Sequence, residues 1–157
     1  MILKGIIHED FCNYKKPSMF IAFPVCSFKC GIDVCQNKDL MLACNVDVKD
    51  IKGLVDKYIS NPISKSIVFG GFEPFDSFED MLELIAAFRS STNDDIVIYT
   101  GYEPSEKQEE LKKIAVYNNI IIKFGRYIPN RSKRFDDILG IYLASDNQYA
   151  VKLEEFK

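Results

Sequence analysis

Residues 23–37 read Phe23-Pro24-Val25-Cys26-Ser27-Phe28-Lys29-Cys30-Gly31-Ile32-Asp33-Val34-Cys35-Gln36-Asn37, so three thiols fall within ten residues. They directly follow an apolar run, Met19–Phe23, that we expect to form a strand. Thiolates this close together on a loop suit a soft metal or an iron–sulfur cluster. A closed tetrahedral site needs four ligands, so three cysteines leave one metal position open to a group other than protein.

The whole chain has the character of a soluble, intracellular protein. Its 157 residues predict one domain spanning 1–157. The net charge of −3 gives no reason to expect nucleic acid or an anionic membrane as a partner. No apolar run approaches the ~20 residues that span a bilayer, and the N-terminus lacks the apolar core of a signal peptide. Five cysteines, an odd number, then point to a reducing cytoplasm in which thiols serve metal binding or chemistry.

Three residues outside the cysteine loop could also serve as metal ligands or catalytic groups. Cys12 and Cys44 are each expected to be a small buried hydrophobe rather than a ligand. His8 is the only histidine, which argues against a hydrolase with a histidine base and against a zinc site made of several imidazoles. We expect His8 to be an exposed or hydrogen-bonded surface residue.

Strand-like and helix-like patterns alternate along the chain. The expected strands are 2–7 (an edge strand or hairpin arm), 19–23, 66–69, 96–99, 120–124, 138–144 and 149–153, with a loop over 129–137. The expected helices are 48–60 capped by Asp47, one opening at Ser77 with Asp80 in a capping box, and one to about 117 capped by Ser105 with Gln108. This alternation predicts an α/β fold with mostly parallel strands, too few to close an eight-stranded barrel and therefore an open, curved partial (β/α) barrel.

The unusual loops all follow expected strands. The cysteines follow the strand that ends at 23, Gly70-Gly71 the next, Thr100-Gly101 the third and Gly125-Arg126 the fourth. Ligands of parallel sheets sit at the carboxyl ends of the strands. These loops are therefore expected to share one mouth.

These residues resemble a known superfamily. Three clustered cysteines after one strand and Gly70-Gly71-Phe72-Glu73-Pro74 after the next are similar to the radical S-adenosylmethionine enzymes. More narrowly, the chain resembles the small activating proteins of anaerobic ribonucleotide reductase. The patches at 98–102, 123–127 and 143–148 support this, so the resemblance runs from residue 20 to about 150.

The resemblance implies a radical-SAM-like partial barrel with a defined ligand set. Cys26, Cys30 and Cys35 would bind three irons of a [4Fe–4S] cluster, and S-adenosyl-L-methionine would chelate the fourth. The cofactor would also be held by a further set of residues: Gly70, Gly71, Glu73, Thr100 and Asn147.

The implied activity is that of an oxidoreductase which activates a glycyl radical enzyme. An electron donor would reduce the cluster, which would cleave S-adenosylmethionine into methionine and a 5′-deoxyadenosyl radical. That radical would take a hydrogen atom from a glycine of the partner, anaerobic ribonucleotide reductase. The cofactors carry this chemistry, while the protein positions the reactants and excludes water.

The sequence departs from the superfamily pattern in two places. The usual spacing is C-x3-C-x2-C with an aromatic residue before the last cysteine, whereas this chain has C-x3-C-x4-C and Val34 there. Phe28 is the substitute for stacking on adenine, and Gly31 is expected to turn the longer arc back. The glycine turn is one residue longer than Gly-Gly-Glu-Pro, which bears on the position of Glu73.

Other interpretations stay open. A non-catalytic metal or iron–sulfur module would close its site with a fourth ligand such as Cys44 or Cys12. A radical S-adenosylmethionine enzyme with another substrate would show the same cysteines. Gly70-Gly71 also suits a plain tight turn. Thr100 and Tyr102 either pack their loop or contact the ligand. Asn147 and Gln148 either occupy turn and strand positions or hold the cofactor. The basic run forms either a solvated face or a docking patch for the reductase; its residues are Arg126, Arg131, Lys133 and Arg134.

Overall fold

The fold is organised by one central sheet. A computed structural model describes residues 1–156, with side chains through residue 154. The sheet has the order β10-β7-β6-β5-β3-β2. Its strands are β2 Gly5–Asp10, β3 Ser18–Phe23, β5 Ser66–Gly71, β6 Asp95–Tyr99, β7 Ile120–Phe124 and β10 Tyr149–Lys152. β3, β5, β6 and β7 run parallel, whereas β2 and β10 pair antiparallel at the edges. The predicted α/β fold with a mostly parallel sheet is confirmed, and within the described residues the sheet is open and not a closed barrel.

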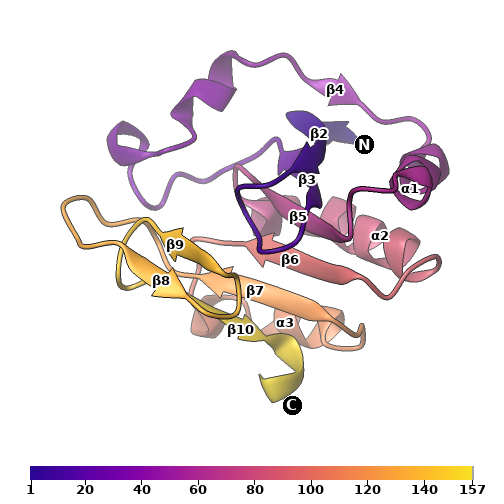
Figure 1. The fold of residues 1–157 in the computed structure, drawn as a ribbon. Coiled ribbons are helices and arrows are strands. Elements are labelled where there is room, and N and C mark those ends of the chain that lie inside the picture. The colour runs from indigo at the N-terminus through magenta and orange to yellow at the C-terminus, as the bar shows by residue number, and fades with distance from the viewer. Residues whose placement is uncertain (157) are drawn as a thin grey trace.

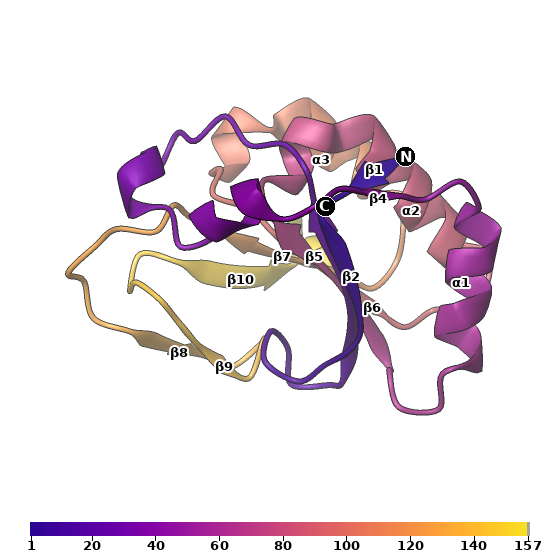
Figure 2. The same cartoon turned by 90° about the horizontal axis from the view of Figure 1, so that it is seen from above.

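Helices cover one face of this sheet, and a small hairpin lies over the other (Figures 1 and 2). The helices are α1 Ile51–Ser60, α2 Phe78–Arg89 and α3 Gln108–Ile114. Each lies in the chain between two parallel strands, as crossover connections require. The hairpin consists of β8 Arg134–Asp136 and β9 Ile141–Leu143.

The parallel strands are buried on both faces because each face has its own cover. Ile67 and Phe69 of β5 pack with the helices in the larger core, while Val68 between them packs with Leu139 and Leu143 on the hairpin side. This is the alternation that a strand's two-residue period imposes. It confirms that the continuously apolar run at 66–69 is a strand buried on both sides.

The C-terminal third differs from the prediction. The strand expected over 138–144 is only Ile141–Leu143, and the expected loop 129–137 contains β8. Gly140, at φ +70°, makes the turn between the two strands. The buried carboxylate of Asp136 accepts from the amides of Leu139 and Ala150, at 2.9 Å each, and so fixes this turn against β10. A buried carboxylate must be hydrogen-bonded. The two amides that satisfy Asp136 hold residues 134–136 in place as a strand, although their sequence looks like a loop.

The start of the chain also folds in two pieces. Residues 2–7 form β1 Ile2–Leu3 and the beginning of β2, which is an edge strand as expected. β1 pairs with β4, Val46–Asp47. Asp47 is therefore extended and does not cap α1, so that prediction is wrong. Asp50 caps it instead, accepting from Gly53 N at 2.8 Å.

At the other two helix starts, the predicted capping residues do not make the capping hydrogen bonds. α2 begins after Ser77 as expected, but Ser77 makes no side-chain cap, because it ends the 3₁₀ turn η3, Pro74–Ser77, that runs into the helix. α3 is shorter than the expected 105–117 and follows a 3₁₀ turn, η4 Pro104–Glu106. The capping box there is made by Glu103 and Glu106, with Ser105 inside the turn.

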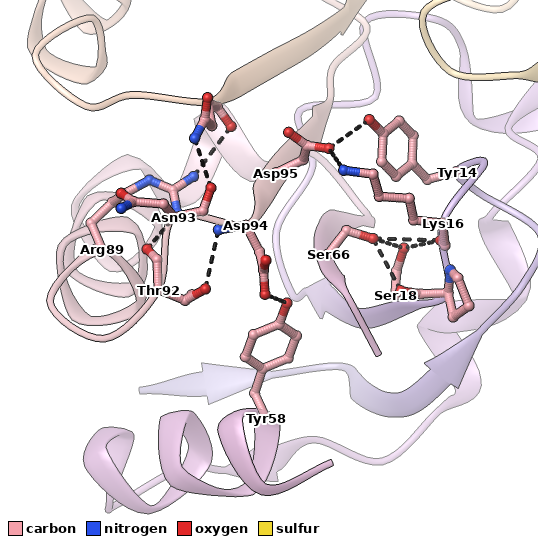
Figure 3. Close-up of polar contacts among 12 residues, drawn as sticks. Tyr14, Lys16, Ser18, Tyr58, Ser66, Arg89, Thr92, Asn93, Asp94 and Asp95 are labelled. Carbon is pink, nitrogen blue, oxygen red and sulfur yellow. Dashed lines mark hydrogen bonds and ion pairs between the residues drawn. The ribbon is translucent and has the colours of Figure 1, made fainter. Parts of the chain in front are cut away.

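A polar network ties together the amino ends of the parallel strands (Figure 3). Asp95 accepts from Tyr14 Oη at 2.9 Å and from Lys16 Nζ at 2.6 Å. Its neighbour Asp94 accepts from Tyr58 Oη of α1 at 2.6 Å. These bonds hold the N-terminal segment, α1 and β6 in place at the end of the sheet opposite to the cysteine loop, and leave the carboxyl ends free to build a site.

Candidate metal centre

A cavity of about 350 Å³ lies at the carboxyl ends of β3, β5, β6 and β7. It is the common mouth expected from the sequence. Among the predicted site residues, those lining it are Cys26, Cys30, Cys35, Gly70, Gly71, Glu73 and Thr100. Asn147 does not line it, although the adjacent Gln148 does. The side chain of Asn147 donates to Arg126 O at 2.8 Å, and its buried Oδ1 has no partner among the described residues.

The cysteine loop bends back on itself at two positions with left-handed backbone. These are Phe28, at φ +51°, and Gly31, at φ +92°. Gly31 N donates to Phe28 O at 2.8 Å, and a 3₁₀ turn, η1 Ile32–Val34, then leads to Cys35. Gly31 thus turns the longer arc, as the sequence suggested, and all three thiols reach the same cavity.

The three thiols are close enough to influence one another electrostatically. The pKa of Cys26 is raised to about 11, chiefly by burial; a hydrogen bond from Phe28 N opposes this rise, and Glu73, Asp76 and Cys30 add to it. Burial also raises the pKa of Cys30, with Cys35 as the next cause. The raised pKa values of Cys26 and Cys30 favour their protonated forms at neutral pH, so a bound cluster must displace those protons.

No group of three His, Cys, Asp or Glu side chains in the described residues surrounds a single metal ion. Cluster ligands need no such common centre, because each cysteine binds a different iron of the cubane.

The glycine turn is required by packing against β3. A Cβ on Gly71, at φ +80°, would lie 2.8 Å from Ala22 Cα, and one on Gly70 would lie 3.0 Å from the Phe20 ring. The Gly71 carbonyl accepts from Asn37 Nδ2 at 2.6 Å. The turn thus seats β5 on β3 and fastens the far end of the cysteine loop to the cavity wall.

Glu73 links three loops at the cavity wall. Its Oε1 accepts from Phe75 N at 3.1 Å and its Oε2 from Gly101 N at 2.9 Å, while its own amide donates to Val25 O at 2.9 Å. Burial raises the pKa of this carboxyl, and hydrogen bonds from Gly101, Thr100 and Phe75 oppose that rise. Despite the extra residue in the turn, Glu73 lines the cavity.

Tyr102 packs the cysteine loop onto its neighbours. Three cations surround its ring, with Lys29 Nζ at 4.7 Å, Lys107 Nζ at 4.5 Å and Arg126 Cζ at 5.5 Å from the centre. Its hydroxyl donates to Asp76 Oδ1 at 2.6 Å. Tyr102 is thus a loop-packing residue.

The sequence analysis missed one cavity residue, Lys123, and left the role of another, Gln148, open. Lys123 is 7% exposed, and burial lowers the pKa of its ammonium group to about 8. Gln148 is also buried and donates to Gly125 O at 3.2 Å. The sequence does carry a signal for Lys123, because it is the one charged residue within the otherwise apolar strand Ile120–Phe124.

The remaining cysteines were predicted wrongly. Cys12 and Cys44 are exposed, not buried. Cys12 sits on the connection between β2 and β3, where Asp10 accepts from Cys12 N at 3.4 Å and holds the turn at the surface. Cys12 lines the cavity, and Cys44 does not.

Of the other residues considered, His8 is exposed, as expected. The rings of Phe28 and Phe72 pack edge to face, with 5.5 Å between their centres. Neither Phe28 nor Val34 lines the cavity. In the basic run, Arg126 pairs with Glu106 and Arg131 with Asp146, while Lys133 and Arg134 are exposed.

No α-helix in the described residues is long and apolar enough to cross a membrane.

Comparison with known proteins identifies the family. Neither curated proteins nor solved structures give a match to the chain. A family model described as a 4Fe-4S single cluster domain matches residues 18–148, which is most of the sequence and includes every cavity-lining strand end. The chain therefore belongs to the 4Fe-4S single cluster domain family.

Proposed function

We propose that this protein is a cytoplasmic radical S-adenosylmethionine activase that generates a glycyl radical on anaerobic ribonucleotide reductase, using an external electron donor. Cys26, Cys30 and Cys35 hold the [4Fe–4S] cluster. The observation that carries the proposal is that these cysteines of one loop line a cavity whose other walls are the ends of β5, β6 and β7. The family supports it, because the 4Fe-4S single cluster domain is found in radical S-adenosylmethionine proteins.

The cavity residues fit both cofactors. Three thiols supply ligands for three irons, whereas the unpartnered Oδ1 of Asn147 is buried outside the cavity lining. Gly70, Gly71 and Thr100 present backbone and hydroxyl groups, and Glu73 presents a carboxylate. When bound, the cluster and S-adenosylmethionine supply one-electron cleavage and hydrogen-atom abstraction. The chain itself binds the two groups, orients them and limits access of water.

The fold is consistent with the partial barrel of this superfamily. The sheet is open, with parallel strands in its centre and the hairpin of β8 and β9 over the face opposite to the helices (Figure 2). We treat residues 1–157 as one such domain.

The size of the cavity favours a macromolecular substrate. A volume of about 350 Å³ is at the lower end of the range for one cofactor-sized ligand. Little room remains for a second small molecule beside S-adenosylmethionine. A partner protein that brings a backbone glycine to the mouth fits this limit. The exposed Lys133 and Arg134 lie at the start of the hairpin whose strand β9 lines the cavity.

A second candidate function is a closed, non-catalytic cluster module. The observation that favours it is that Cys12 lines the same cavity as the cysteine trio. A fourth thiolate would complete the cluster and exclude S-adenosylmethionine from it.

Anaerobic purification with iron and sulfide analysis, followed by reduction with S-adenosylmethionine, tests the proposal. We expect a brown protein with four irons per chain, 5′-deoxyadenosine as product, and a glycyl radical signal on added anaerobic ribonucleotide reductase. Cys30→Ala should lose the cluster and the cleavage, whereas Cys12→Ala and the control Cys44→Ala should retain both.

Each alternative has its own outcome. Loss of the cluster in Cys12→Ala would support the closed module. 5′-Deoxyadenosine without any glycyl radical would point to another substrate. A colourless protein with one zinc per chain would reject the cluster altogether.

A further inference from the structure

The exposed aromatic side chains of this protein gather on two segments beside the cavity mouth. In the part of the chain whose side chains the structure describes, the exposed aromatic residues are Phe11, Phe135 and Tyr142. Phe135 lies in β8 and Tyr142 in β9, while Phe11 lies in the connection between β2 and β3. Both segments also line the cavity, the connection through Cys12 and the hairpin through β9. Aromatic residues are enriched where proteins bind other proteins, so this clustering marks a candidate interface.

The hairpin presents its aromatic pair outward because its other face is already used. Phe135 and Tyr142 lie directly opposite each other, and their rings pack edge to face with 5.2 Å between centres. On either side of Tyr142, Ile141 and Leu143 pack into the hairpin-side core. The two-residue period of a strand therefore points Tyr142 and Phe135 away from that core, and they are 69% and 48% exposed. The fold leaves this pair of rings uncovered.

The two segments form one continuous rim. The backbone amide of Lys15, in the connection between β2 and β3, donates to Leu139 O at 2.8 Å, next to the hairpin turn. A Cβ on Gly140 in that turn would lie 2.7 Å from Lys15 Cβ, so the two segments are in close contact (Figure 2). Tyr142 itself lines the cavity, which makes the rim continuous with the mouth.

The hairpin side of the rim is positively charged. Residues 126–135 contain four basic residues and no acidic one, although the whole chain has a net charge of −3. Arg126 and Arg131 are each paired with a carboxylate. Among the described residues, neither Lys133 nor Arg134 forms an ion pair, and both are exposed. Their charge is therefore available to an acidic partner.

The composition of the rim favours a polypeptide over a nucleic acid. Two unpaired cations neutralise few phosphates, and the net charge of −3 repels a polyanion. An exposed aromatic pair next to an arginine is instead the composition of protein-binding hot spots.

We propose that this rim is the docking surface for the polypeptide substrate. An acidic segment of the partner would pair with Lys133 and Arg134, and an apolar side chain of that segment would pack on Phe135 and Tyr142, with Phe11 on the other side of the mouth. This assignment rests on the proposed function, in which the partner is the reductase. Docking on the rim would hold the glycine over the mouth while the cavity itself stays filled by the cofactors.

Equilibrium binding of the cluster-loaded protein to intact anaerobic ribonucleotide reductase tests the docking surface. Phe135→Ser should bind about 10- to 100-fold more weakly than wild type, because a few aromatic side chains carry much of an interface's energy. Lys133→Glu should bind about 3- to 10-fold more weakly at low salt. That difference should vanish near 1 M salt, where the screening length is about 3 Å. The matched controls are Ile59→Ser on α1 and Lys65→Glu before β5, since both side chains are exposed and lie away from the mouth.

A second measurement separates docking from cofactor chemistry. Formation of 5′-deoxyadenosine without the reductase should be the same in Phe135→Ser, Lys133→Glu and wild type, while the glycyl radical yield at subsaturating reductase should fall in both variants. If Phe135→Ser disturbs the hairpin and lowers cleavage as well, Lys133→Glu decides, because it leaves the aromatic pair in place.

The outcomes distinguish this inference from the proposed function. Wild-type affinity in Phe135→Ser and Lys133→Glu, with a normal glycyl radical on the reductase, would overturn the docking surface and leave the proposed function standing. An equal loss of affinity in the two controls would overturn it as well. So would self-association of the wild type that Phe135→Ser abolishes, which would show a second copy on the rim, or displacement of the reductase by a single-stranded oligonucleotide. A wild-type protein that neither binds the reductase nor forms a radical on it would reject the proposed function.

Discussion

Replacing Gly71 by alanine tests the packing that positions the cysteine loop. Gly71 has φ +80°, and a Cβ added there would lie 2.8 Å from both Cα and Cβ of Ala22. The left-handed conformation costs an alanine about 1–2 kcal/mol, and forcing a methyl group into a packed site costs about 1–3 kcal/mol. We therefore expect Gly71→Ala to lower the free energy of unfolding by about 2–5 kcal/mol.

The same change should disturb the metal centre. Phe72 N donates to Phe23 O at 3.3 Å and Glu73 N to Val25 O at 2.9 Å, so the glycine turn holds the strand end from which the cysteine loop departs. A displaced Ala22 moves this strand end. We expect a lower iron content per chain in Gly71→Ala than in wild type after identical anaerobic reconstitution.

Urea unfolding of the cluster-free protein measures the packing term by itself. The matched control is Gly5→Ala, because a Cβ on Gly5 meets nothing within 4 Å. The control should change the free energy of unfolding by less than about 1 kcal/mol. If the free energy of unfolding of Gly71→Ala lies within about 0.5 kcal/mol of the wild-type value, packing against β3 does not require a glycine at this position. Its glycines would then be required only by a ligand.

Three further predictions concern contacts that position the site. Asp50→Ala should destabilise the protein by about 1 kcal/mol in urea unfolding, because the N-cap of α1 is lost. Burial would raise the pKa of Asp95, but hydrogen bonds from Lys16 and Tyr14 outweigh it and hold this pKa below its usual value. Its contribution to stability is therefore present above the unfolded pKa of about 3.9 and is lost as pH falls through the folded pKa, so the stability gap between wild type and Asp95→Asn should narrow below about pH 4. Tyr102→Phe should cost about 1.5–3 kcal/mol, because the hydrogen bond to the Asp76 carboxylate is lost while the ring and its cations remain.

Each of these predictions has a control or a contradicting result. Ser77→Ala is the control for Asp50→Ala, since Ser77 makes no cap bond and its loss should have little effect. A constant stability gap between pH 3 and 7 would show that the Asp95 carboxylate is not stabilised by its partners. Unchanged stability in Tyr102→Phe would show that the hydroxyl is satisfied equally well by water.

Much of the scaffold could be predicted from local pattern. The apolar runs at 66–69, 96–99 and 120–124 became parallel strands, because a strand buried on both faces needs no polar positions. The glycine turn and the cysteine loop reached one cavity, because parallel strands end at the same edge of a sheet.

Other features depended on partners distant in sequence. Asp47 has the composition of a helix cap, but its pairing with Ile2 makes it extended. Residues 134–136 look like a polar loop, yet Asp136 is buried beside Ala150 and forms a strand. In both cases long-range hydrogen bonding outweighed local propensity.

By itself, the sequence determined that parallel strands would carry three thiols and a glycine turn to a shared mouth, since strand period and crossover geometry are local properties of the chain. Only the tertiary structure decided which other side chains face that mouth. Burial of Lys123, exposure of Cys12 and the position of Glu73 depend on what neighbouring strands and loops place around them. The charge that a residue offers to a ligand is set by those neighbours, and no local pattern records them.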